Sequence, residues 1–103
     1  MAAEPAFDEA IHAPSRLRLC GLLRPVEDAE FSALRATLDM SEANLSKTVK
    51  ALVELGYAQV KKESSASRSD RRRTTSVSLT ARGKRAFDGH VAALQRLAAG
   101  VVV

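Results

Sequence analysis

The sequence predicts a mainly α-helical domain with one small β-hairpin (α+β), in the order α-α-α-β-β-α. Four segments have apolar residues at helical spacing, and two short segments late in the chain have the composition of strands. A run of small polar residues separates these two strands, as expected for the connection of a hairpin. The chain has 103 residues, which fits one compact domain.

The first helix is expected over about residues 14–23. Pro14 suits the first turn of a helix, where its missing N–H is not needed, and Pro25 ends the helix. Residues 1–12 are expected to form a short, partly ordered lead-in. Residues 26–30 are predicted to be a connector that has room for a very short strand.

The second helix is expected over about 31–38 and the third over about 42–55, with a link of only a few residues between them. Ser41 is a good N-cap, because its hydroxyl can accept a hydrogen bond from the first turn. Gly56 is a natural residue to follow the C-terminal end. The apolar face of the third helix comprises Leu45, Val49, Leu52 and Val53.

Residues 57–61 alternate apolar and polar side chains and predict the first strand. Residues 63–70 are small and polar and predict a loop, and a second strand is expected over about 74–79. Thr80 then caps a last helix over about 81–98. The apolar stripe of this helix comprises Phe87, Val91, Leu94 and Ala98.

Two adjacent helices joined by a very short turn, followed by a hairpin, make a winged helix-turn-helix. Four stretches, Ile11–Leu19, Met40–Lys47, Leu52–Tyr57 and Leu79–Gly83, occur in this order and at matching spacing. Together they resemble the MarR-type winged-helix DNA-binding family, in its short single-domain branch, over about residues 9–99. The resemblance implies a homodimeric transcription factor that places its third helix in the DNA major groove.

The positive charge of the chain is concentrated near the hairpin. The net charge is +4, and residues 61–73 alone hold six basic and two acidic residues. A basic connection beside a recognition helix suits contact with DNA phosphates, and one arginine there can enter the minor groove. The alternative is an ordinary solvated run of charge. The residues expected to bind DNA from the hairpin are Lys62, Arg68, Arg71, Arg72 and Arg73.

The outer side of the third helix is the second part of the predicted DNA interface. Asn suits adenine and Lys suits guanine in the major groove, while small residues let the helix approach closely. The free N–H groups of the first turn, next to Ser41, can hold a phosphate. The alternative is a solvated helix face with an ordinary cap. The residues expected to bind DNA from this helix are Ser41, Asn44, Ser46, Lys47 and Lys50.

The last helix is predicted to form a homodimer interface through its apolar stripe, helped by the segment before the first helix. The domain itself is expected to span residues 13–99. A dimer would match a pseudo-palindromic operator with half-sites about one helical turn apart. The alternative is that the stripe packs only on its own domain. Gly83 and Gly89 are expected to weaken this helix somewhat.

Cys20 is the only cysteine, and its place among leucines predicts a small buried hydrophobe. The alternative is a redox- or ligand-gated repressor that senses through Cys20, because some MarR-type regulators respond to oxidants through a lone cysteine. His12 is expected to cap a helix, and His90 to lie on a helix surface or at an interface. These residues lack metal-ligand spacing, so no metal is expected.

The sequence has no nucleophile–base pair, no phosphate-binding glycine loop and no carboxylate pair on one helix face. We therefore expect no enzymatic activity and no cofactor. No apolar run is long enough to span a bilayer, and the N-terminus lacks the features of a signal peptide. The expected location is the cytoplasm, without a membrane partner. A winged helix that serves as a protein-interaction module is the alternative to DNA binding.

Overall fold

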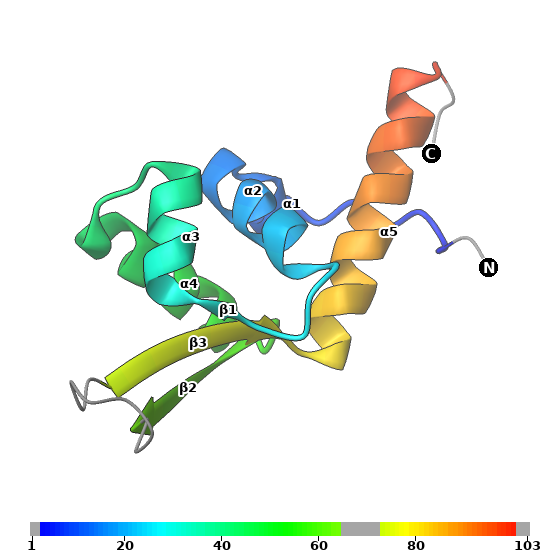
Figure 1. The fold of residues 1–103 in the computed structure, drawn as a ribbon. Helices are drawn as coiled ribbons and strands as arrows, with labels where there is room; N and C mark the ends of the chain where they lie inside the picture. Colours follow the sequence, from blue (N-terminus) through cyan, green and yellow to red (C-terminus); the bar gives the residue numbers. More distant parts are fainter. Residues whose placement is uncertain (1–2, 65–72, 101–103) are drawn as a thin grey trace.

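The computed structural model describes residues 3–64 and 73–100 and has a helical body with a three-stranded antiparallel sheet (Figure 1). The sheet order is β1-β3-β2. The hairpin of β2 and β3 extends away from the body, and α5 stands at the opposite edge of the molecule (Figure 1). In chain order the elements are α1 (Glu9–His12), α2 (Pro14–Leu23), β1 (Ala29–Glu30), α3 (Phe31–Leu38), α4 (Glu42–Glu54), β2 (Ala58–Ser64), β3 (Arg73–Leu79) and α5 (Ala81–Ala98).

The predicted fold class is confirmed, and the helix ends agree closely with the capping residues of the sequence. Helices α2, α3 and α5 have the predicted bounds, and α4 ends one residue early, at Glu54. The 26–30 connector, predicted to have room for a very short strand, contains β1, which pairs with β3. These agreements arise because proline, Ser41 and Thr80 set helix starts through local chemistry that the sequence displays directly.

Helix α1 is an element that sequence reasoning missed. It has only four residues and one buried side chain, Ile11. The Asp8 side chain caps it by accepting a hydrogen bond from the Ile11 amide. A single turn of this kind has too little periodicity to be recognised, and its order depends on tertiary packing.

The hairpin is longer than predicted. The strand prediction of 57–61 corresponds to β2 over Ala58–Ser64, and β3 begins at Arg73. Residues 63 and 64 were expected in the loop, but they pair with residues 74 and 73 in the antiparallel ladder. Their small and charged composition disfavours a strand, and the cross-strand hydrogen bonds override it.

The core lies where α2, α3 and α4 meet the inner face of the sheet. Val77 of the central strand is fully buried and lies opposite both Ala29 and Val60. Phe87 of α5 packs against this core while remaining partly exposed. The buried cluster comprises Leu19, Cys20, Leu23, Leu34, Leu38, Leu45, Val49, Leu52, Ala58, Val77 and Leu79.

The junction of α4, β2 and α5 is held by one compact set of contacts. The Thr80 hydroxyl accepts a hydrogen bond from the Gly83 amide at 3.0 Å and donates one to the Gly56 carbonyl at 2.6 Å. The Thr80 amide donates to the Tyr57 carbonyl at 2.9 Å. A Cβ on Gly83 would lie 2.0 Å from that carbonyl oxygen, so only glycine fits there.

The two glycines of α5 therefore serve a purpose that helix propensity does not capture. They were expected to weaken the helix. Gly83 instead allows the backbone of Tyr57 to approach α5, and Gly89 allows the N-terminal segment to cross it. A Cβ on Gly89 would lie 3.2 Å from the Glu4 carbonyl oxygen and 3.3 Å from the Ala6 Cβ.

Candidate nucleic-acid interface

Helices α3 and α4 form the helix-turn-helix, and their turn orients α4. Asp39 adopts the left-handed conformation, with φ of 53°, which turns the chain sharply after α3. Ser41 then caps α4, because its hydroxyl accepts a hydrogen bond from the Asn44 amide at 3.1 Å. Leu45, Val49 and Leu52 are buried against the core. The opposite side of α4 is left for solvent or a ligand.

The structure brings the predicted contact residues of α4 together on that exposed side. Asn44, Ser46, Lys47 and Lys50 are all exposed. The Ser41 hydroxyl is engaged as an acceptor in the cap, but its own hydrogen remains available to donate to a phosphate oxygen. Thr48, which lies between Lys47 and Val49, is buried and donates to the Asn44 carbonyl at 2.9 Å.

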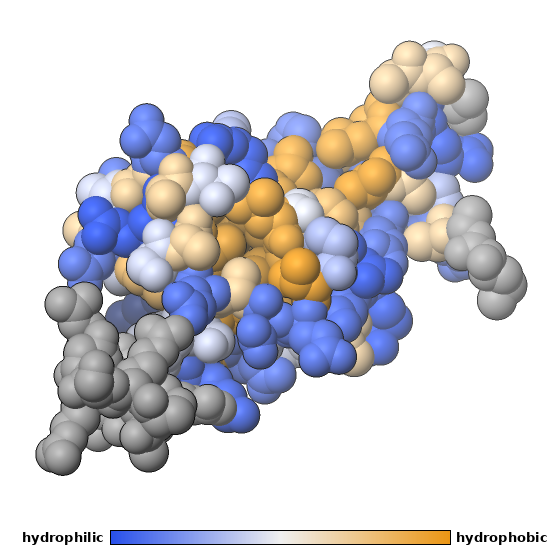
Figure 2. Space-filling view, in the orientation of Figure 1, coloured by the Kyte–Doolittle hydropathy of each residue, from blue (hydrophilic) through white to orange (hydrophobic). Residues whose placement is uncertain are grey.

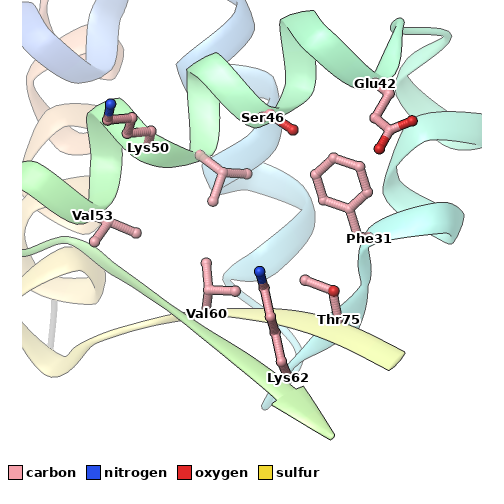
Figure 3. Close-up of a pocket in the computed structure, with 9 residues that line it drawn as sticks. Phe31, Glu42, Ser46, Lys50, Val53, Val60, Lys62 and Thr75 are labelled. Carbon is pink, nitrogen blue, oxygen red and sulfur yellow. The ribbon is translucent and has the colours of Figure 1, made fainter. Parts of the chain in front are cut away.

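A groove of about 470 Å³ separates α4 from the strands (Figure 3). Its apolar lining comprises Val49, Val53 and Val60. Lys50 of α4 and Lys62 of β2 line the groove from opposite elements, and the Lys62 side chain points toward α4 (Figure 3). The remaining lining residues are Phe31, Glu42, Ser46 and Thr75.

The hairpin places basic residues beside this groove. Lys62 is exposed on β2 and pairs in register with Thr75 of β3. Arg73 is the first residue of β3 and pairs in register with Ser64. The predicted contacts at Arg68, Arg71 and Arg72 lie outside the described residues. Even so, the chain connects β2 to β3 through a segment in which arginines predominate over acids.

The predicted dimer stripe is divided between the core and the surface. Phe87 packs on the core of its own domain. Its ring lies beside α2, since a Cβ on Gly21 would be 3.9 Å from it. Val91 and Leu94 are half-buried, whereas Ala98 is exposed. Leu97, which the stripe did not include, is 52% exposed and is the largest apolar side chain left open on α5. The residues that α5 buries completely or nearly so are Gly83, Gly89, His90 and Ala93.

Apolar surface gathers over α2 and continues along α5 (Figure 2). Leu22 of α2 is partly buried and packs at the edge of the core. Leu94 and Leu97 continue the apolar character toward the C-terminal end of α5, which projects beyond the body (Figure 1). Contiguous apolar surface of this kind on a small domain typically marks an interaction site.

The prediction that His90 lies on a surface or at an interface was wrong. Its side chain is 0% exposed, and its Nδ1 accepts a hydrogen bond from the Asp8 amide at 2.9 Å. The N-terminal segment covers it, because the Ala6 amide bonds the Gly89 carbonyl at 2.9 Å. The sequence predicts only a short, partly ordered lead-in for this segment and therefore does not place His90 beneath it.

Cys20 is fully buried in the core, as expected for a small hydrophobe. Burial, with a contribution from the negative charge of Asp8, raises the pKa of its thiol to about 11. A redox-sensing cysteine needs an accessible thiolate. The Cys20 thiol is neither accessible nor readily ionised. The structure therefore argues against the alternative in which the protein senses through Cys20.

A helix-turn-helix with an exposed polar helix face, beside a hairpin with a basic connection, defines a winged-helix protein of the nucleic-acid-binding class. Residues 15–98 match the family model of the winged helix DNA-binding domain. The chain belongs to this family. Membership in a DNA-binding family points to binding rather than catalysis.

A search of solved structures supports the fold. The structure of the transcriptional regulator homologue protein from Pyrococcus horikoshii OT3 superposes with a TM-score of 0.82. The alignment covers 90% of this chain and 88% of that chain, at 24% sequence identity. No curated protein matches the chain. Within residues 3–64 and 73–100, no helix is long and apolar enough to cross a membrane.

Proposed function

We propose that this chain is a sequence-specific transcription regulator that binds duplex DNA as a homodimer. The observation that carries the proposal is the exposed face of α4, where Asn44, Lys47 and Lys50 lie together beside the basic hairpin. Helix α4 enters the major groove, and the hairpin follows the phosphate backbone. The family match supports DNA binding, and the resemblance to MarR-type proteins supports the regulatory role.

Helix α4 reads the base sequence in this proposal. Asn44 lies in the first turn, and Lys47 lies one turn further along the same exposed side. An amide pairs well with adenine and an ammonium group with guanine, so both can discriminate bases. The capped N-terminus of α4 can hold a phosphate, although Glu42 in the first turn moderates its attraction for anions.

The hairpin supplies affinity. Lys62 on β2 and Lys50 on α4 border the groove in Figure 3, and the arginines at 68 and 71–73 follow along the chain. Phosphate contacts of this kind release counterions and carry little sequence information. We therefore assign positioning and salt-dependent affinity to the hairpin.

The proposed dimer forms through α5. Val91 and Leu94 are half-buried and Leu97 is exposed, and together they offer apolar surface on a helix that projects from the body. A two-fold dimer presents two α4 helices to the two halves of a pseudo-palindromic site. The N-terminal segment, which crosses α5 at Gly89, lies close enough to contribute to the same surface.

The test is fluorescence anisotropy of the protein on DNA from upstream of its own gene and on random duplex, over a series of salt concentrations. We expect tighter binding to the upstream DNA and a steep loss of affinity with salt. Equal weak binding to both would refute sequence specificity. No binding even at low salt would favour the alternative in which the winged helix binds another protein.

A further inference from the structure

Both histidines of the chain meet in one contact. The chain contains two histidines, His12 on α1 and His90 on α5. His12 Nδ1 lies 3.2 Å from His90 Nε2, within hydrogen-bonding distance. The rings are 5.2 Å apart between centroids and meet edge to face. His90 is fully buried, whereas His12 is exposed to solvent.

The hydrogen bonds of this pair determine where its protons lie. His90 Nδ1 accepts from the Asp8 amide, so it carries no proton in the observed arrangement. Neutral His90 therefore carries its proton on Nε2 and donates it to His12 Nδ1. His12 Nδ1 is then an acceptor as well. Each hydrogen bond therefore requires an unprotonated acceptor: His90 Nδ1 for the bond from the Asp8 amide, and His12 Nδ1 for the bond from His90 Nε2.

We propose that the His12–His90 pair is a proton-sensitive latch that holds residues 6–12 against α5 and that acidification opens it. A proton on His90 Nδ1 would face the Asp8 N–H, and a proton on His12 Nδ1 would face the His90 Nε2–H. Either event sets two donors against each other and breaks a hydrogen bond. Histidine is the residue that changes charge in this range of pH.

Other contacts near the histidine pair also hold the N-terminal segment in place. The Ala6 amide bonds the Gly89 carbonyl at 2.9 Å, and Phe7 lies 4.7 Å from the His90 ring and 4.9 Å from the His12 ring. The Tyr57 hydroxyl donates to Asp8 Oδ2 at 2.6 Å. Tyr57 immediately precedes β2, so the latch also touches the base of the hairpin.

The direction of the pH effect follows from burial. Burial, followed by the charge of His12, lowers the pKa of His90 below its ordinary 6.5, and the nearby Asp8 carboxylate offsets only part of this. The closed latch thus favours neutral His90. Its stability is complete above the ordinary histidine pKa and is lost as the pH falls below it.

The other groups around the pair do not titrate in the same window. Burial alone would raise the pKa of Asp8, but hydrogen bonds from Tyr57 and the α1 amides lower it overall. The hydrogen bond to Asp8 raises the pKa of Tyr57, and burial raises that of Cys20 on α2 to about 11. Two arginines nearby carry permanent charges. The charge of Arg16 acts to lower the pKa of Cys20, and the Arg82 guanidinium lies 5.7 Å from the centre of the Tyr57 ring.

The consequence for the dimer rests on the proposed function. The segment 3–5 lines a hollow on α5 with Ala92, Gln95, Arg96 and Ala99, next to the apolar stripe. Release of the segment removes its contribution to the surface that a second copy would meet. We therefore expect acid to weaken the dimer, and with it the affinity for a two-half-site DNA.

The direct test is hydrogen exchange measured by NMR from about pH 7.5 to about pH 5.5. The reporters are the amides of Ala6 and Asp8, which bond Gly89 and His90. Their protection factors, corrected for the intrinsic pH dependence of exchange, should fall by up to about tenfold per pH unit below the histidine pKa. The amides of α4 should keep their protection. Constant protection of Ala6 and Asp8 would overturn the latch.

Two variants separate a latch from simple packing. In His90→Asn, the amide oxygen can replace Nδ1 as acceptor for the Asp8 N–H and does not titrate. Protection should then become independent of pH. If this buried variant does not fold, His12→Asn at the exposed position tests the same idea. Loss of the His12 charge brings the pKa of His90 in the closed latch nearer its ordinary value, so the pH dependence should become shallower. An unchanged pH dependence in whichever variant folds would assign the effect to another group and overturn the proposal.

Sedimentation over the same pH range tests the consequence for the dimer. A dimer that weakens with acid in the natural chain, but not in His90→Asn, would support the coupling. A pH-independent dimer would refute the coupling while the exchange data still decide the latch. A chain that is monomeric at every pH would refute the proposed dimer instead, so the two failures are distinguishable.

Discussion

Gly83 shows how strongly one residue constrains this fold. The missing side chain lets the Tyr57 carbonyl approach α5, where a Cβ would lie 2.0 Å from the oxygen. Gly83→Ala should therefore destabilise the domain by about 3 kcal/mol, because backbone must move to relieve the clash. Urea unfolding, followed by circular dichroism, measures this change.

Gly21→Ala is the matched control. Gly21 is an exposed helix residue, and an added Cβ would meet only the Phe87 ring at 3.9 Å, an ordinary contact. Alanine there should stabilise the domain by up to about 1 kcal/mol through helix propensity. Similar effects of the two substitutions would show that the approach of Tyr57 does not constrain position 83.

Asn44 is the residue that we expect to contribute most to sequence discrimination. Its side chain is exposed in the first turn of α4. Asn44→Ala should reduce the preference for the operator over random duplex by about 1–3 kcal/mol and leave nonspecific affinity nearly unchanged. Anisotropy on both duplexes measures the ratio. Gln59→Ala on β2 also removes an exposed amide, one that does not line the groove of Figure 3, and should alter neither affinity.

At the scale of elements, helices were more predictable than strands. Helix ends follow from caps and prolines such as Pro14, Ser41 and Thr80, whose effects are local. The ends of β2 and β3 depend on cross-strand pairing, which a single strand does not display. Helix α1 depends on burial of Ile11 beneath distant parts of the chain, and the sequence carries no strong signal for it.

The candidate DNA-binding site, like the fold, could be predicted from the sequence only in part. The exposed side of α4 follows from helical periodicity, so Asn44, Ser46, Lys47 and Lys50 were found together. The groove between α4 and β2 was not predicted, because it depends on how the hairpin is placed relative to the helix. The burial of His90 was missed for the same reason, since a segment some eighty residues away in sequence covers it.

The hairpin connection should act as a source of salt-dependent affinity. Arg72→Ala and Arg73→Ala should each weaken binding to operator and random DNA alike and reduce the salt slope by about one unit. Arg85→Ala, which removes an exposed arginine on α5, is the control and should leave the slope unchanged. The measurement is the logarithm of affinity against the logarithm of salt concentration. A selective loss of operator binding would mean that these arginines read bases.

At the scale of the whole molecule, the proposed dimer depends on the exposed end of α5. Leu97 is 52% exposed, so Leu97→Glu should cost the monomer little stability while placing a charge in the proposed interface. Analytical ultracentrifugation should show a monomer. Affinity for a two-half-site DNA should fall on the order of 10²-fold, because the second half-site is no longer bound through a linked subunit.

Ala81→Glu is the control for that prediction. It adds the same charge at an exposed position in the first turn of α5, at the other end of the helix from Leu97, and should leave the dimer intact. Thermal unfolding of both variants as monomers at low concentration separates folding from association. If Leu97→Glu remains dimeric, the interface lies elsewhere, and the apolar surface over α2 becomes the next position to test. If it becomes monomeric but keeps its full affinity for DNA, one domain suffices for binding and the operator need not be palindromic.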